Sequence, residues 1–411
     1  MSKKIISITL AVAIFGIIAI AGSLAIAPAA SAATVTATKA VAATTKAMPL
    51  QIGAWLPYWQ GQPGAQSIAI HLDSFNEISP FSYEISSDGL ITDDLQIGSG
   101  MWDSYFSALH DEGVKIIPTI AYFDAQGIYT LLSNTKTRQA AEDTIAQLVQ
   151  GRDFNGIDID FEGMSPATRP YYSLFIQGLA MRLHSQGESL TCTVVPRTPP
   201  SSLYVNPPAN IVYPENYTVL NQSCDEVRLM AYDQEGVDLK LDATKGGNGT
   251  LYAPVADPDW VKKLVVYALQ YISPKKIMLG VPTYGYEYEV SWANNQTTYQ
   301  RVRAFDYFDA MARATSTGSA VTRNNADELT FAFASTTYIQ EPPILTFTES
   351  STQPPILMNP NPNATTTFFV SFPDAQSEMD KVALAKQYGL RGVMFFKADG
   401  QMDPALWNLL P

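Results

Sequence analysis

Three acidic residues, Asp158, Asp160 and Glu162, alternate with apolar residues between positions 157 and 162. Because successive side chains of a β-strand point to opposite faces, we expect the three acids to share one face. Carboxyl groups gathered in this way suit acid–base chemistry, in which one carboxyl gives a proton to a leaving group and later takes one back. A solvated strand face or a metal-binding cluster would show the same alternation.

The surroundings of this acidic strand favour catalysis. Apolar β-runs separated by helical segments indicate a parallel sheet covered by helices, so the acidic face would point into a barrel. Inward carboxylates cost free energy to desolvate unless they lie near the open carboxyl end, where barrels of this kind keep their active sites. Glu162 is the last of the three acids and is therefore expected closest to that end.

The elements that would position these acids follow one repeating order. Eight β-runs are expected, with helices between most of them, and this order predicts an α/β fold of the (β/α)8 TIM barrel type. The expected strands are residues 52–59, 77–83, 114–121, 154–162, 189–195, 226–233, 276–284 and 390–396. Residues 289–370 break the alternation and are expected to form a small α+β insertion between strand 7 and strand 8, with a helix at 303–314.

Composition limits the class of partner. The chain has 411 residues, 26 of them basic and 39 acidic, for a formal net charge of −13. Without a long basic run we expect no nucleic-acid partner. The 3 histidines and 2 cysteines show no zinc-ligand spacing, so we expect no metal and no cofactor. We expect a monomer.

The N-terminus resembles a targeting segment. Residues 1–32 carry two early lysines, an apolar run and a small-residue cleavage site, which predicts a signal peptide or, alternatively, an N-terminal membrane anchor that tethers the protein. Residues 33–48 are interpreted as a flexible linker and 49–411 as the barrel. The barrel is then expected to be secreted or in the cell envelope, where Cys192 and Cys224 either form a disulfide or remain two buried thiols.

The acidic strand also resembles a known signature. Residues 155–162 are similar to the Asp-x-x-Asp-x-Asp-x-Glu pattern of glycoside hydrolase family 18, the chitinase-like hydrolases. Residues 230–233 match the Met-x-Tyr-Asp pattern of its sixth strand, and residues 280–285 and 392–396 resemble its seventh and eighth strands. Within the family, the segments 79–83, 230–234 and 284–286 look closest to the spore-germination and cortex-lytic branch, whose members act on peptidoglycan.

The resemblance implies an activity and roles for individual residues. The family hydrolyses β-1,4 bonds next to an N-acetylhexosamine with retention, and the acetamido oxygen of the substrate is the nucleophile. By that resemblance Glu162 is the general acid and then the base, and Asp160 orients the acetamido N–H. Asp158 is expected to share a proton with Asp160, because adjacent inward carboxylates resist ionising together. Tyr232 would donate to the acetamido oxygen, and Asp233 would contact the sugar.

Two positions depart from the family pattern. Its first acid is Asn155 here, which is not the catalytic position, so we expect activity to survive. Its strand-eight tryptophan, the floor under the reacting sugar, is Phe396 here, which offers a smaller ring face and can change the preferred sugar. The further residues expected to bind substrate are Tyr284, Trp55, Tyr58 and Met230.

Three functions from different classes remain open. The first is a glycosidase acting on an N-acetylglucosamine-containing polysaccharide, either peptidoglycan or a chitin-type glycan. The second is a catalytically silent, lectin-like carbohydrate-binding protein on the same barrel. The third is a structural cell-envelope protein with a vestigial cleft, which would bind no sugar. Silent relatives usually lose the acid at the Glu162 position, so the presence of this glutamate favours the enzyme.

Overall fold

The computed structural model describes residues 49–410 except 99, 235–237, 248, 294–295 and 336–365. They belong to one of the two units into which the chain divides, 47–411. The segments interpreted as signal peptide or anchor and as linker, residues 1–32 and 33–48, lie outside the described residues. Within the described ranges no helix is long and apolar enough to cross a membrane.

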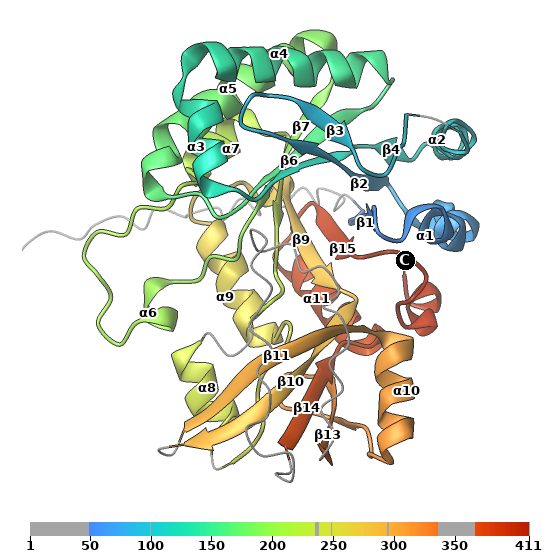
Figure 1. The fold of residues 1–411 in the computed structure, drawn as a ribbon, viewed down its shortest axis with the longest axis vertical. Helices are drawn as coiled ribbons and strands as arrows, with labels where there is room; N and C mark the ends of the chain where they lie inside the picture. Colours follow the sequence, from blue (N-terminus) through green and yellow to red (C-terminus); the bar gives the residue numbers. More distant parts are fainter. Residues whose placement is uncertain are drawn as a thin grey trace, which may run out of the picture. The chain divides into compact units, whose positions relative to one another are not determined.

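The predicted barrel is present (Figure 1). Its strands pair in parallel with their neighbours, and β1 pairs with both β2 and β15, so the sheet closes on itself. The barrel strands are β1 (Gln51–Pro57), β2 (Glu77–Ile85), β4 (Lys115–Ile116) with β5 (Thr119–Tyr122), β6 (Gly156–Phe161), β7 (Ser189–Val194), β8 (Glu226–Leu229), β9 (Ile277–Pro282) and β15 (Gly392–Phe396). The short strand β3 (Ile91–Asp93) extends the edge of β2 in the antiparallel direction.

Two strands differ from their predicted extent. The run expected at 114–121 is divided into β4 and β5, because Pro118 has no backbone N–H to give to a neighbouring strand. The strand expected at 226–233 ends at Leu229, so residues 230–233 lie beyond β8 at the carboxyl end of the barrel. The functional residues predicted there therefore sit on a loop that a rigid strand positions.

The longer helices were predicted from the sequence; of the shorter ones only η4 (Pro404–Asn408) was, as a last helix expected to end near residue 410. Expected helices correspond to α2 (Trp102–Asp111), α4 (Thr135–Gly151), α5 (Arg169–Gln186), α9 (Pro258–Ala268) and α11 (Ala375–Gln387). Short segments carry too few turns for a clear apolar period. They are α1 (Gly61–Ile68), η1 (Ala69–Ser74), α3 (Ala125–Ser133), η2 (Pro166–Thr168), α6 (Pro200–Leu203), α7 (Tyr217–Ser223), α8 (Leu239–Lys245), η3 (Pro274–Lys276) and η4 (Pro404–Asn408).

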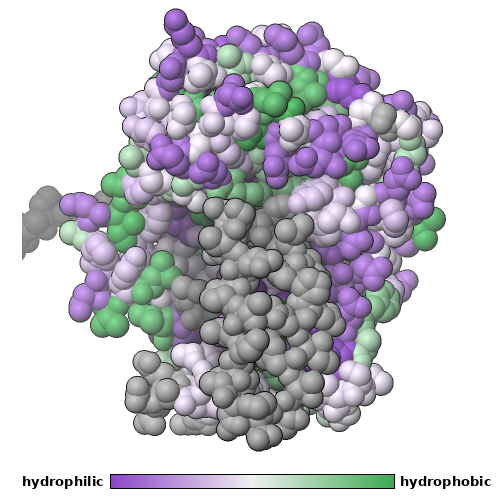
Figure 2. Space-filling model, in the orientation of Figure 1, coloured by the Kyte–Doolittle hydropathy of each residue, from purple (hydrophilic) through white to green (hydrophobic). Residues whose placement is uncertain are grey.

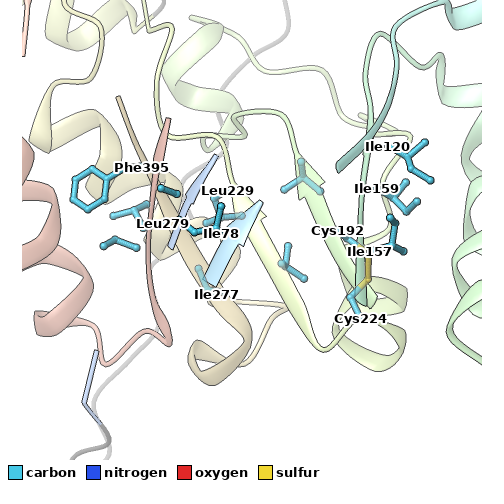
Figure 3. Close-up of a cluster of buried hydrophobic side chains, with 14 of the residues drawn as sticks. Ile78, Ile120, Ile157, Ile159, Cys192, Cys224, Leu229, Ile277, Leu279 and Phe395 are labelled. Atoms are coloured by element: carbon cyan, nitrogen blue, oxygen red, sulfur yellow. A yellow bond between two sulfur atoms is a disulfide. The ribbon is translucent and has the colours of Figure 1, made fainter. Parts of the chain in front are cut away.

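Strand β6 has the two faces that its sequence predicts. Ile157 and Ile159 are fully buried in the apolar layer between sheet and helices (Figure 3), and the ring of Phe161 stacks on Phe175 of α5 with centroids 5.5 Å apart. The acids on the other face point into the barrel, since Asp158 contacts side chains from β1, β5, β7 and β8. Burying the apolar face thus fixes the direction of the acidic one.

The predicted insertion is a second sheet with one helix. Its elements are β10 (Tyr284–Ala293), β11 (Gln296–Asp306), α10 (Tyr307–Thr317), β12 (Thr322–Arg323), β13 (Leu329–Ser335) and β14 (Thr366–Phe372), in the antiparallel order β11-β10-β14-β13-β12. The sheet begins at Tyr284, before the expected boundary at 289, because β9 continues almost directly into β10. The helix expected from residue 303 begins at Tyr307, because β11 stays paired with β10 as far as Asp306.

The two cysteines form a disulfide. Cys192 lies on β7 and Cys224 lies between α7 and β8, and their sulfur atoms are bonded (Figure 3). Of the two alternatives left open by the sequence, the structure shows the cross-link. It ties α7 and the start of β8 to the neighbouring strand.

The connection between β7 and α7 runs over the surface. Residues 198–214 contain no charged side chain, and five prolines leave only the short helix α6. Leu203, Tyr204 and Val205 are exposed, and the surface around α6 is partly hydrophobic (Figure 2). Val195 and Pro196, at the start of this connection, line a cavity at the carboxyl ends of the barrel strands.

Candidate active site

A cavity of about 540 Å³ lies at the carboxyl ends of the barrel strands. The strand ends of β6, β8 and β15 form its floor, and β10 and β11 of the insertion form one wall. Its lining residues include Trp55, Trp59, Gln60, Asp160, Glu162, Thr193, Met230, Tyr232, Asp233, Tyr284, Tyr286, Arg301, Asp306, Phe396 and Lys397. The barrel and the insertion therefore build one site.

Glu162 lies directly after β6 and is partly exposed to this cavity. Its backbone N–H donates to the carbonyl oxygen of Tyr122 at 3.0 Å, which fixes the strand end. Burial, then the negative charges of Asp233 and Glu215, raise the pKa of Glu162 to about 7. The carboxyl group can therefore carry a proton near neutral pH and give it to a bound ligand.

Asp160 lies deeper and is buried at 4% exposure. Burial, followed by the charges of Glu162 and Asp158, raises its pKa well above the usual range, and Arg228 opposes this shift. Within the described part of the chain, its Oδ1 atom has no hydrogen-bond partner although it is buried. A buried oxygen at a cavity wall that lacks a protein partner can accept a hydrogen bond from a bound ligand.

Asp158 lies at the bottom of the site and is fully buried. The hydroxyl groups of Thr119 and Thr193 each donate to it at 2.9 Å, and the guanidinium of Arg228 lies 3.1 Å away. The indole N–H of Trp55 donates at 3.5 Å. Asp158 is held by protein groups, in contrast to Asp160.

Tyr232 and Asp233 follow β8 at the cavity. Asp233 has a left-handed backbone, with φ of 59°, and its Oδ1 accepts hydrogen bonds from the hydroxyls of Tyr284 at 2.6 Å and Tyr286 at 2.8 Å. These two bonds from the insertion hold an uncommon backbone conformation in place. Burial, then the charge of Asp160, raises the pKa of Tyr232, so its hydroxyl stays protonated and can donate.

Phe396, the residue expected to form the floor under the sugar, is surrounded by aromatic rings. Its ring stacks on Tyr232 with centroids 5.4 Å apart and an interplanar angle of 18°. Trp55 and Trp59 meet it edge-on, at 5.7 Å and 6.4 Å. Trp59 thus adds an indole to the site in which the family's own strand-eight indole is missing.

The predicted site residues come together with two differences in position. Asp158 lies beneath the cavity and does not line it, and Tyr58 lines a separate cavity of about 220 Å³ beside Asp94 and Trp102. The others border the main cavity: Glu162, Asp160, Tyr232, Asp233, Phe396, Tyr284, Trp55 and Met230. Among the described residues, no group of three or more His, Cys, Asp or Glu is placed to hold a metal ion.

Several charged residues near the site were not predicted. Arg228 lies fully buried under the acids, and Arg197 pairs with Glu215 at 2.6 Å beside Glu162. Arg228 had a visible signal, because Glu226 and Arg228 alternate with apolar residues on the face of β8 that leads to Tyr232. The pair of Arg197 and Glu215 had none, because both belong to a loop.

The fold and the site together define a class: a (β/α)8-barrel hydrolase with a glutamate of raised pKa beside buried acids. The family described as Glycosyl hydrolases family 18 matches residues 81–401, most of the described chain. The chain belongs to this family.

Comparisons with individual proteins agree with this assignment. The cortical fragment-lytic enzyme of Bacillus cereus is 25% identical over 337 residues, covering 80% of this chain and 66% of that enzyme. The crystal structure of the Bacillus cereus spore cortex-lytic enzyme SleL has a TM-score of 0.64 at 20% identity, covering 88% of this chain and 73% of that one. A chitinase structure from Chromobacterium violaceum has a TM-score of 0.63 at 21% identity, covering 88% and 98%.

These similarities confirm the expected likeness to the spore cortex-lytic branch, and the two structures support the fold. The chain spans between 46% and 66% of the length of the curated relatives it matches.

Proposed function

We propose that this protein hydrolyses β-1,4 glycosidic bonds next to an N-acetylhexosamine with retention, and that the acetamido oxygen of the substrate is the nucleophile. One observation carries the proposal. Asp160, whose buried Oδ1 has no hydrogen-bond partner among the described residues, lines the same cavity as Glu162, whose pKa is raised to about 7. An acetamido N–H is a donor of the kind that this oxygen lacks.

The reaction proceeds in two steps. Glu162 gives its proton to the glycosidic oxygen while the bond from C1 to that oxygen breaks and the acetamido oxygen forms a bond to C1. This yields an oxazolinium ion and a free hydroxyl on the leaving sugar. The carboxylate of Glu162 then takes a proton from water, whose oxygen attacks C1 and opens the ring on the original face.

The neighbouring side chains orient the acetamido group. Asp160 accepts from its N–H and, as negative charge builds on this carboxyl group, stabilises the positive ring. The protonated hydroxyl of Tyr232 donates to the acetamido oxygen. Tyr284 and Tyr286 hold Asp233 in place by their hydrogen bonds. Asp233 then accepts hydrogen bonds from hydroxyl groups of the sugar.

The substrate in this proposal is a peptidoglycan or chitin-type glycan. Relatives that carry the names cortical fragment-lytic enzyme and chitinase both support a glycan of N-acetylhexosamine units. Action outside the cytoplasm, with or without a tether through residues 1–32, is part of the same proposal, and so is a monomeric state.

The test uses the purified chain incubated separately with chitin oligosaccharides and with de-crosslinked peptidoglycan strands. Mass spectrometry identifies the products, and proton NMR identifies the anomer formed first. A β-anomer from either glycan is expected. An α-anomer formed first would contradict the mechanism, and binding without cleavage of either glycan would establish the lectin-like alternative.

A further inference from the structure

Arg228 lies inside the barrel beneath the catalytic acids, where a cation is costly to bury unless it is fully paired. It is fully buried, and its guanidinium contacts one carboxylate oxygen from each of Glu77, Asp158 and Glu226 at 3.1 Å. Its Nη1 also donates to the hydroxyl of Ser79 at 2.9 Å. We call these residues the Arg228 cluster.

The contacts of Asp158 leave little place for a proton. Its Oδ2 faces Nη1 of Arg228 at 3.1 Å and the indole N–H of Trp55 at 3.5 Å, and both of these groups can only donate. The hydroxyl of Thr119 donates to the same oxygen at 2.9 Å, and Thr193 donates to Oδ1 at 2.9 Å. A proton on Oδ2 would point at donors, so the ionised form fits this set of contacts.

The surroundings of Asp160 differ from those of Asp158. Asp160 lies two residues further along the same strand face, at the cavity, and its buried Oδ1 has no partner among the described residues. Charged groups act on Asp160 from two strands: Asp158 on β6 and Glu162 directly after it disfavour a second negative charge, and Arg228 on β8 favours one. The hydroxyls of Tyr172 on α5 and Tyr232 after β8, whose pKa values burial raises, also lie close enough for the charge of Asp160 to raise these pKa values further.

We propose that Arg228 is a positioning residue for the glycosidase reaction: it holds Asp158 ionised beneath Asp160, so that the buried proton of this strand resides on Asp160. This inference rests on the proposed function for its role in catalysis. It replaces the expectation that Asp158 and Asp160 share a proton. Two protons then belong to the resting site, one on Asp160 and one on Glu162.

The consequence for the reaction concerns the acetamido group. A proton on Oδ2 of Asp158 would displace the contacts to Arg228 and Trp55, and a proton on Oδ1 would displace the hydrogen bond that Thr193 donates. When Glu162 loses its own proton to the glycosidic oxygen, the Asp160 proton can move to the new carboxylate of Glu162, and it returns to Asp160 before Glu162 takes a proton from water in the second step. The negative charge then shifts toward Asp160, next to the forming oxazolinium ion, and no proton leaves the site in this step.

Infrared difference spectroscopy tests where the proton lies, without substrate. Spectra are recorded for the full chain and for Asp160→Asn, Asp158→Asn and Glu226→Gln at a pH near 6, and each variant is subtracted from the wild type. Glu226→Gln is the control: it removes another carboxyl group that contacts Arg228 outside the cavity, so it identifies the band of Glu226 itself, and the C=O band lost in Asp160→Asn is expected to remain. Circular dichroism checks that each variant is folded.

The expected result is loss of one protonated-carboxyl C=O band in Asp160→Asn, and loss of a carboxylate band, with this C=O band retained, in Asp158→Asn. Loss of the same C=O band in Asp158→Asn would overturn the proposal, because the proton would then reside on Asp158. Neither result depends on cleavage, so failure of the proposed function is seen separately as absence of products.

Arg228 itself is tested by a pair of variants. Arg228→Lys keeps a cation, and the band assigned to Asp160 is expected to remain. Arg228→Gln removes the cation, and Asp158→Asn in that background is then expected to lose a C=O band that it did not lose with Arg228 present. An unchanged pattern in the Arg228→Gln background would show that Arg228 does not control Asp158. If Arg228→Gln fails to fold, the comparison of Asp158→Asn with Asp160→Asn decides.

Discussion

At the scale of single residues, the activity should report the titration of Glu162. Its pKa is raised to about 7 by burial and by Asp233 and Glu215, and in the proposed mechanism the protonated form is the general acid. As pH rises through that value the acid is lost, so kcat/KM should fall about tenfold per pH unit above about 7. A pH profile on an oligosaccharide substrate measures this, and a flat profile up to pH 9 would contradict the role of Glu162.

The two hydrogen bonds to Asp233 give a second prediction at this scale. Tyr284→Phe or Tyr286→Phe removes one donor to a carboxylate, which is worth about 1.5–3 kcal/mol, or roughly ten- to a hundredfold in kcat/KM. Tyr288→Phe is the matched control, because the hydroxyl of Tyr288 is buried without a hydrogen-bond partner in the described structure. Equal effects of all three substitutions would show that the hydrogen bonds to Asp233 do not matter.

At the scale of elements, the sequence predicted what a local period can encode. Alternation in β6 placed Asp158, Asp160 and Glu162 inward, and the structure confirms it. The long hairpin of β10 and β11 was not predicted, because its tyrosines and arginines do not follow a simple apolar period. The partners of Asp158 come from four strands, and no local pattern specifies which side chains meet across a barrel.

The disulfide belongs to the same scale, since it ties β7 to the segment before β8. The cysteines are separated by 32 residues in sequence. Closing a loop of that length in the unfolded chain corresponds to about 3–4 kcal/mol of stability. The variant with both Cys192→Ala and Cys224→Ala should lose about that free energy of unfolding in urea titrations while it keeps its activity at 25 °C. A loss below about 1 kcal/mol would contradict this reasoning.

At the scale of the whole molecule, buried acids should make stability fall as pH rises. Burial and neighbouring charges raise the pKa of Glu162 to about 7, of Asp242 to about 7 and of Glu226 to about 8. Between the unfolded value, about 4, and these folded values the native state binds more protons than the unfolded state. The free energy of unfolding therefore decreases with pH over this window.

Thermal unfolding at a series of pH values measures this effect. Stability from these groups is fully present below about pH 4 and is lost as pH rises toward 8, and each kcal/mol corresponds to roughly 2–4 °C in Tm. Asp238 and Asp374 have lowered pKa values, so their contribution to stability increases with pH. This increase is confined to the acidic range around their pKa values. A Tm that rises steadily from pH 5 to pH 8 would contradict the account.

The complete site exists only in the whole molecule. The acids come from β6, the Tyr232–Asp233 pair follows β8, and β10 and β11 supply the tyrosines that hold Asp233. The sequence predicted which of these residues would take part through motif and resemblance. It did not predict Arg197 or Glu215, since long-range charge pairing leaves little trace along the chain, and it missed Arg228 although the alternation in β8 pointed to this residue.

The most direct test of the central claim compares the purified chain with Glu162→Gln on an N-acetylhexosamine oligosaccharide. Initial rates give hydrolysis, and calorimetry with the same glycan gives binding. We predict that Glu162→Gln lowers kcat roughly 10²–10⁴-fold, the range of general acid–base catalysis, with Kd within a few-fold of the wild type. Hydrolysis by Glu162→Gln at the wild-type rate, or no hydrolysis by the wild type while it binds the glycan, would contradict the assignment of Glu162 as the catalytic acid.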